Sequence, residues 1–187
     1  GLFLFVSLVA NAAEQRAAKV AWGGVAAFSQ ARVTNALDAA VRQRGTSGGV
    51  AMPGIFLHPL NADRAVADYG RVRLAWELGQ RLFFLAYAGI SEGFNWQDEK
   101  NPPDGARFYV TVNGTDIIST HVRGPGWVSL LAEVPVAAGL ASEQQTVTVA
   151  LSTDCGPAGN SNYDWALFGE PLIVAVDGRP LPEAEGV

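Results

Sequence analysis

Short runs of alternating apolar and polar residues, separated by turn residues, follow one another from residue 50 to residue 176. In the run Thr146–Ser152, apolar side chains recur at every second position, which places them on one face of a strand. The run Arg81–Ile90 is almost wholly apolar, as expected for a strand that is buried on both faces. Asn113-Gly114 is the strongest short signal for a β-hairpin. This pattern predicts a mostly β chain that folds as an antiparallel jelly-roll β-sandwich of about eight strands.

The predicted strands are Val50–Leu57, Ala65–Leu78, Arg81–Ile90, Arg107–Val112, Asp116–Thr120, Trp127–Val136, Thr146–Ser152 and Leu167–Val176. The last two are joined by a polar, glycine-rich loop. Strand, loop and strand are typical of the closing hairpin of an antiparallel sandwich. We therefore expect residues 50–178 to form one β-sandwich domain, followed by a short C-terminal tail, residues 179–187.

The preceding residues, 13–49, have a different pattern. Alanine is frequent, Glu14 comes early and Arg42 and Arg44 come late, which suits a helix and its dipole. Gly23-Gly24 should divide this region into two shorter helices. Residues 45–49, GTSGG, read as a flexible linker and as the domain boundary. The sequence thus predicts an N-terminal helical, partly hydrophobic extension ahead of the sandwich.

Residues 1–12 open the chain with a hydrophobic segment. Residues 1–10 are apolar except for Ser7, and Ala10-Asn11-Ala12 has the form of a signal-peptidase site. Three interpretations compete: the remainder of a signal peptide, an uncleaved N-terminal anchor, and an ordinary buried segment. A helix of ten residues spans only about 15 Å, roughly half a bilayer core. We favour an anchor whose apolar side chains contact lipid or another chain: Leu2, Phe3, Leu4, Phe5, Val6 and Leu8.

Composition narrows the class of protein. At 187 residues, the chain is long enough for one sandwich and an extension, and 49% of its residues are hydrophobic. Its net charge of −5, without any run of Lys and Arg, argues against a nucleic-acid partner. A single cysteine excludes an intramolecular disulfide.

A series of short motifs between residues 50 and 176 resembles the galactose-binding-like jelly-roll modules, which include carbohydrate-binding domains appended to glycosidases. The motifs are residues 54–59 (GIFLHP), 104–108 (DGARF) with Val110, Val112 and Asn113-Gly114, Trp127, 145–147 (QTV), Thr153-Asp154, 156–159 (GPAG), 164–166 (DWA) and 169–171 (GEP). Their order and spacing carry the resemblance, which does not extend to the first 45 residues. It implies a non-catalytic binding fold, and a fold does not fix a function.

The sequence offers little chemistry for catalysis. A nucleophilic triad needs a histidine, and only His58 and His121 are present. Cys155 lies in a Gly/Pro loop without a basic neighbour to lower its pKa, so an inert thiol is expected. There is no zinc-type spacing of Cys and His and no phosphate-binding glycine loop. We therefore expect no enzyme activity and no organic cofactor.

Oxygen-bearing side chains gather in the loop before the last strand. Asp154, Asn160, Asn162 and Asp164 are candidate ligands for Ca²⁺, which takes several such oxygens. The alternative is that these side chains stabilise the loop itself through Asx-turns. Modules of the resembled kind often carry a structural calcium ion, and this keeps Asp154, Asn162 and Asp164 as a candidate site.

Aromatic residues beside the predicted loops form a second candidate site. Phe94, Trp96 and Tyr163 could present a flat face to a sugar ring or anchor a protein interface. Trp165 is followed at once by strand residues and is expected in the core.

Two classes of function remain open. The first is a structural or accessory subunit on the periplasmic face of a membrane, tethered by its N-terminus to lipid and to other subunits of an assembly. The second is a carbohydrate-binding module that recognises a glycan through its loop aromatics. We favour the first, because a sugar-binding module needs neither the apolar segment nor the helical extension.

Overall fold

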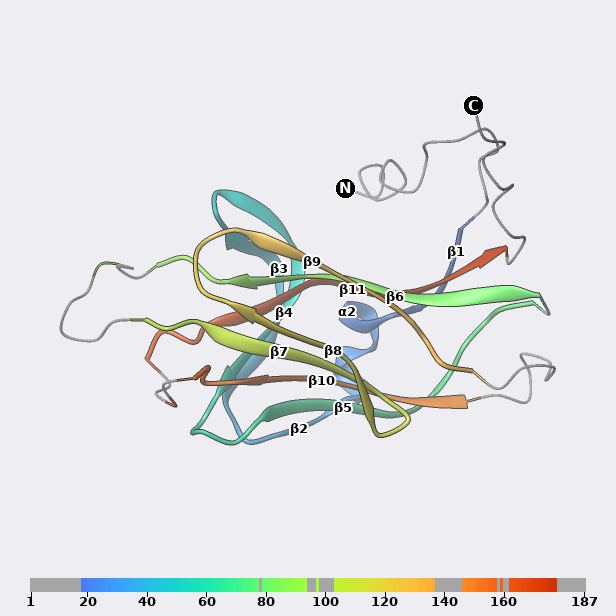
Figure 1. Ribbon diagram of the computed structural model, residues 1–187, viewed down its shortest axis with the longest axis horizontal. Coiled ribbons are helices and arrows are strands. Elements are labelled where there is room, and N and C mark those ends of the chain that lie inside the picture. The colour runs from blue at the N-terminus through green and yellow to red at the C-terminus, as the bar shows by residue number, and fades with distance from the viewer. Residues whose placement is uncertain are drawn as a thin grey trace, which may run out of the picture.

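The computed structural model describes residues 18–77, 79–93, 97, 103–136, 146–157, 159 and 162–177. These residues form two antiparallel sheets that pack face to face as a β-sandwich, as predicted (Figure 1). The strands are β1 (Lys19–Gly23), β2 (Arg32–Thr34), β3 (Ala36–Ser47), β4 (Val50–Pro59), β5 (Ala65–Arg73), β6 (Gln80–Ile90), β7 (Ala106–Val112), β8 (Thr115–Val122), β9 (Trp127–Glu133), β10 (Thr146–Asp154) and β11 (Ala166–Asp177). A short helix, α2 (Gly24–Ala27), and one 3-10 turn (Phe28–Gln30) connect β1 to β2.

Sheet 1 has six strands in the order β3-β4-β11-β6-β9, with β1 beside β11. A β-bulge between Gly169 and Leu172 divides β11. The part before the bulge pairs with β4, and the part after it pairs with β1. Sheet 2 has five strands in the order β2-β5-β10-β7-β8. Strands distant in the sequence therefore lie side by side in both sheets.

The core lies between the two sheets and consists of the alternate residues that the strand pattern predicts. Phe84 of β6, Phe108 of β7 and Phe168 of β11 are fully buried. The Phe108 and Phe168 rings meet edge to face across the sandwich, with centroids 5.1 Å apart. Contacts of this geometry stabilise a core beyond the burial of area alone.

The helices predicted over residues 13–44 are wrong for most of the described part of that region: Lys19–Gly23, Arg32–Thr34 and Ala36–Ser47 are strands, and only α2 and the 3-10 turn are helical. Residues 45–49 are likewise no linker. Gly48 and Gly49 have φ of +57° and +77° and form the turn that joins β3 to β4. Positive φ at both central residues suits the twist of a β-hairpin, and glycine adopts it without strain. Alanine-rich composition favoured helix, but pairing with β4 decides the structure.

The predicted closing hairpin is a second correction. β10 lies in sheet 2 between β5 and β7, whereas β11 lies in sheet 1. The loop after Asp154 thus crosses from one sheet to the other. The hairpin predicted at Asn113-Gly114 is confirmed: it joins β7 to β8, and both residues have positive φ.

The tip of the β3–β4 hairpin folds over the outer face of sheet 1, at the left in Figure 1. Ser47 Oγ donates to the Gly126 carbonyl oxygen at 3.0 Å, and Trp127 Nε1 donates to the Val50 carbonyl oxygen at 2.9 Å. Gly45 lies against the Leu167 side chain. These contacts cover the outer face close to the start of β9 and β11.

The predicted anchor, residues 1–12, and the predicted tail, residues 179–187, lie outside the described residues. Among the residues that are described, no helix has the length and apolar character needed to cross a bilayer.

Candidate ligand-binding site

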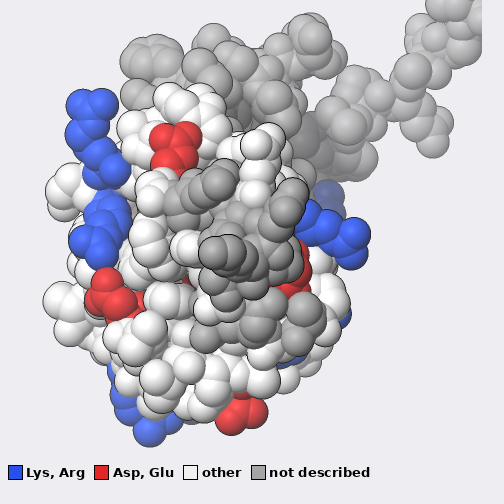
Figure 2. Space-filling view, turned by 90° about the vertical axis from the view of Figure 1, so that its left-hand side faces the viewer, with Lys and Arg blue, Asp and Glu red and all other residues white. Residues whose placement is uncertain are grey.

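The loops that connect β6 to β7, β8 to β9 and β10 to β11 meet at one end of the sandwich, on the left in Figure 1. Ser91 N donates to the Trp165 carbonyl oxygen at 2.7 Å, which ties the first of these loops to the third. Figure 2 views this end. On its described part, Lys and Arg side chains are interspersed with Asp and Glu side chains and do not form one basic patch.

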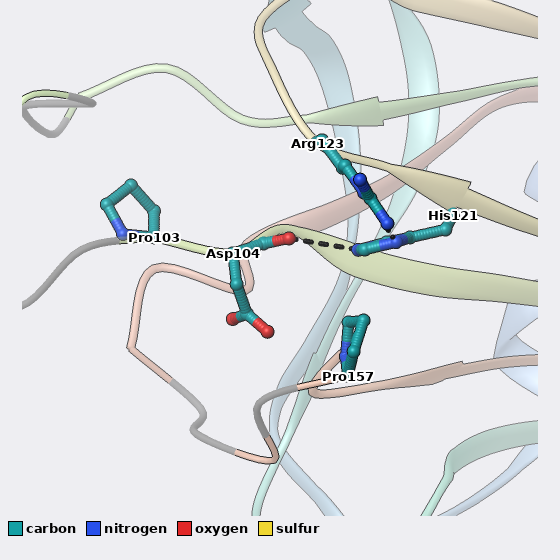
Figure 3. Close-up of a pocket in the computed structure, with 5 residues that line it drawn as sticks. All are labelled: Pro103, Asp104, His121, Arg123 and Pro157. Carbon is teal, nitrogen blue, oxygen red and sulfur yellow. Dashed lines mark hydrogen bonds between the residues drawn. The ribbon is translucent and has the colours of Figure 1, made fainter.

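A pocket of about 370 Å³ opens at this end, and Figure 3 shows its lining. Pro103 and Asp104 come from the loop before β7, His121 and Arg123 from the end of β8, and Pro157 from the loop after β10. Three segments far apart in the sequence therefore contribute to one site. The lining combines a carboxylate, an imidazole and a guanidinium group with two proline rings.

Hydrogen bonds fix the orientation of the His121 ring. Arg123 Nε, which can only donate, lies 3.0 Å from His121 Nδ1. Nδ1 is therefore the acceptor, and Nε2 carries the proton that is donated to the Asp104 carbonyl oxygen at 2.9 Å (Figure 3). Both ring nitrogens are engaged, so the ring is held in one orientation beside Arg123.

Two glycines allow the loops to approach so closely. Gly105 and Gly156 have φ of +83° and +68°, which side-chain-bearing residues rarely adopt. A Cβ atom on Gly156 would lie 2.6 Å from the Gly105 carbonyl oxygen and 3.1 Å from Asp104 Oδ2. One on Gly105 would overlap the Val122 carbonyl oxygen. The pocket thus depends on backbone contacts that only glycine permits.

Behind the pocket, the Asp164 carboxyl group is fully buried, and neither oxygen has a hydrogen-bond partner. Burial, reinforced by the charge of Asp104, raises the pKa of this carboxyl to about 8. The neighbouring Cys155 thiol opposes the shift, but its proton is directed at the Asn61 carbonyl oxygen, 2.7 Å away. Burial raises the pKa of Cys155 itself to about 12, in agreement with the inert thiol expected from the sequence.

Of the predicted calcium ligands, Asp154, Asn162 and Asp164 are described, and Asn160 lies outside the described residues. Asp154 Oδ1 accepts from the Gly156 backbone N–H at 2.9 Å, and its Oδ2 accepts from the Tyr109 hydroxyl at 2.6 Å. Asp154 thus stabilises its own loop, which is the alternative that the sequence left open. Asn162 is exposed. Within the described ranges, no group of three or more His, Cys, Asp and Glu side chains could hold a metal ion.

The predicted aromatic platform is only partly described. Phe94 and Trp96 lie outside the described residues. Tyr163 is half-buried in the loop before β11, with φ of +65°, and is not among the pocket-lining residues. Trp165, expected in the core, is half-buried at the loop end, where Gly93 packs against its ring.

The pocket residues themselves were missed as a binding site. One signal was available: His121 and Arg123 are two positions apart just after the predicted strand Asp116–Thr120, so their side chains share a face if the strand continues. Their convergence with Asp104 and Pro157 depends on contacts between loops, which no local pattern indicates.

No protein-family model matches the sequence, and a search of curated proteins finds no match. Among solved structures, the CBM51-2 and INT domains of Clostridium perfringens ZmpB are similar, at 18% identity and a TM-score of 0.48, over 78% of this chain and 30% of that one. A cyclase from Fischerella sp. in its apo form matches at 10% identity and a TM-score of 0.49, over 87% and 98% of the two chains. The carbohydrate-binding module CBM36 in complex with calcium and xylotriose matches at 11% identity and a TM-score of 0.40, over 79% and 95%.

The present chain spans about three tenths of the length of the ZmpB structure. Similar structures thus include carbohydrate-binding modules, the class that the sequence resembles, together with cyclases from Fischerella. At identities of 10–18% and TM-scores below 0.5, these likenesses concern the fold alone, and what the chain binds has to be argued from its own residues.

Proposed function

We propose that the chain is a non-catalytic binding module that holds a saccharide in the pocket between Asp104, Arg123 and Pro157. The observation that carries the proposal is the composition of the pocket: a carboxylate and a guanidinium group stand beside proline rings in one open hollow. Of the two classes of function that the sequence leaves open, the described residues favour this one.

The chemistry of a saccharide matches this lining. Each sugar hydroxyl both donates and accepts hydrogen bonds, so a carboxylate can accept from one hydroxyl while a guanidinium group donates to its neighbour. The C–H face of a sugar ring is apolar and can pack on Pro103 or Pro157. A hollow of about 370 Å³ lies in the size range of small-ligand sites, about 300–1,000 Å³.

The engaged state of His121 supports a binding role over a catalytic one. Its two ring nitrogens are held by Arg123 and by the Asp104 carbonyl oxygen, and the Cys155 thiol is buried. The role of a membrane-tethered accessory subunit rests on residues 1–12, so it stays a prediction. Calcium at Asp154, Asn162 and Asp164 also stays a prediction: the unpartnered carboxylate of Asp164 supports it, and the engaged oxygens of Asp154 speak against it.

Replacing Arg123 with alanine is expected to weaken glycan binding at least tenfold. Hydrogen bonds to a charged group contribute about 1.5–3 kcal/mol, and about 1.4 kcal/mol corresponds to a factor of ten in affinity. A glycan array on the full chain identifies the ligand, and isothermal titration calorimetry then compares the variants.

Arg73→Ala provides the matched control, because Arg73 is an exposed arginine at the far end of β5. It should bind like the unchanged protein. The proposal would be contradicted if Arg123→Ala and Arg73→Ala bound every glycan with equal affinity. It would also be contradicted if the chain bound no glycan on the array.

A further inference from the structure

The outer face of sheet 1 is apolar over several neighbouring strands. In one row, Leu85 of β6 lies between Leu131 of β9 and Leu172 of β11. In the next row, Val174 of β11 lies between Phe83 of β6 and Val20 of β1. Glu133 of β9 and its ion-pair partner Arg81, which lies over the Phe83 ring, border this row on the other side. The alternate residues Leu82, Phe84 and Ile173 are fully buried in the core, so the six apolar side chains of the two rows lie on the outer side of sheet 1, where Val174 at the centre is only 7% exposed. We call these six residues the apolar face.

The apolar face is a specific feature and does not follow from the sandwich as such. Leu131 is 64% exposed and Val20 is 48% exposed, and they stand at its two borders. The outer face of sheet 2 is more polar: it carries Thr111, Ser119, Thr148, Ser152 and Arg107 alongside Ala150. Contiguous apolar surface of this kind marks a contact with another segment, another chain or a membrane.

The contacts of the β3–β4 hairpin tip cover only part of this outer face. They reach Gly126, Trp127 and Leu167, which lie close to the loop end of the sheet. The apolar face occupies the other half of the sheet, where β1 pairs with the second part of β11. The apolar composition of Arg81–Ile90 predicted a strand buried on both faces. Sheet 2 covers only the inner face of this strand.

We propose that the apolar N-terminal segment of the same chain, Leu2–Leu8, packs on this face as a third layer. Two observations select this occupant over a second copy or a lipid surface. The chain enters the sheet through β1, which forms one border of the face. The residues ahead of it, 1–10, are apolar except for Ser7. The apolar residues 1–10 therefore precede, in the sequence, the strand that forms one border of the apolar face.

The length of the connection is sufficient. The face spans four strands, and neighbouring strands are about 4.8 Å apart, so its width is about 14 Å. Between Leu8 and Lys19, the chain can extend about 3.3 Å per residue, which exceeds this width more than twofold. Burial of the segment and of the face would remove both from water at about 25 cal/mol per Å² of apolar area.

Engineered disulfides in the full chain test the proposal. Leu131→Cys is combined in turn with cysteine at Leu2, Phe3, Leu4, Phe5, Val6 or Leu8, and the variants are oxidised in a glutathione buffer. Cys155 should not interfere, because it is buried. At least one pair is expected to form an intramolecular disulfide in most molecules. The control combines the same N-terminal cysteines with Leu60→Cys, a 50% exposed site in the β4–β5 loop, and should stay at background.

A second readout does not depend on disulfide geometry. Leu131→Asp should release the segment and raise the rate of trypsin cleavage after Arg16 about tenfold, whereas Leu60→Asp should leave it unchanged. Leu131→Asp should also lower the melting temperature, because release of the segment loses the apolar burial, whereas Leu60→Asp should keep the melting temperature of the unchanged protein.

Three results would overturn the proposal. The first is that the cysteine pairs with Leu131→Cys and those with Leu60→Cys form disulfides to the same extent, and that trypsin cleaves Leu131→Asp and Leu60→Asp at equal rates. The second is a disulfide-linked dimer of the single variant Leu131→Cys, which would assign the face to a second copy. The third is flotation of the full chain with phosphatidylcholine vesicles, which would assign the segment to lipid.

Discussion

Replacing Asp164 with asparagine is expected to remove a fall in stability that the unchanged protein shows between about pH 4 and pH 8. The Asp164 carboxyl has a pKa of about 8 in the folded chain against 3.8 as its ordinary value. In this interval the folded state retains a proton that the unfolded state releases. Stability therefore decreases as pH rises through the interval and stays at its lower level above pH 8.

The size of this effect follows from the shift. One pKa unit corresponds to about 1.36 kcal/mol, so a rise from 3.8 to about 8 costs roughly 5 kcal/mol at pH 8. The cause is physical: a fully buried carboxylate without a donor loses its hydration and gains no hydrogen bond in return. An asparagine carries no charge, and its contribution should be the same at pH 4 and at pH 8.

Urea unfolding at pH 4, 6 and 8 measures this difference. The control is Asp63→Asn, because Asp63 is exposed and should leave the pH dependence as it is. The same slope of stability against pH in the unchanged protein and in Asp164→Asn would contradict the assignment. The experiment also tests the calcium prediction. An ion held by Asp164 would make 1 mM CaCl₂ stabilise the unchanged protein at pH 8 and leave Asp164→Asn unaffected.

The elements that the sequence predicted well are those with local signals. The alternation in Thr146–Ser152 lies within β10, and Asn113-Gly114 forms the turn between β7 and β8. Both signals concern residues adjacent in the sequence. The inner faces of these strands could therefore be assigned before their partners were known.

The N-terminal strands could not be assigned in this way. Ala39 and Ala40 carry good helix propensity, and their place in β3 comes from pairing with Leu57 and Phe56. That pairing depends on the turn at Gly48 and Gly49, which composition alone presents equally well as a linker. Tertiary pairing decides the structure here, and propensity is overruled.

The candidate site was predictable only in part. The loop around Asp164 was recognised as rich in oxygen ligands, but the burial of this one carboxyl follows from the packing of the loop across both sheets. The pocket is similar in this respect. His121 and Arg123 share a strand end, whereas Asp104 and Pro157 reach them through contacts between separate loops.

Gly105→Ala is expected to destabilise the fold by about 2–6 kcal/mol and to abolish the proposed glycan binding. Two costs combine. An alanine at φ of +83° is strained, by about 1–3 kcal/mol. Its Cβ atom would also overlap the Val122 carbonyl oxygen and lie 2.8 Å from Arg123 Cα, and overpacking of this kind costs about 1–3 kcal/mol.

Gly114→Ala separates these two costs. Gly114 has φ of +77°, but a Cβ atom there meets nothing within 4 Å. The free energy of unfolding of Gly114→Ala should therefore fall only by the cost of backbone strain, about 1–3 kcal/mol, and this variant should bind glycan like the unchanged protein. Urea unfolding gives the two stability losses, and calorimetry gives the two affinities under conditions where both variants are folded. Equal losses of stability, or unchanged binding by Gly105→Ala, would show that the contact between the Gly105 loop and β8 does not shape the pocket.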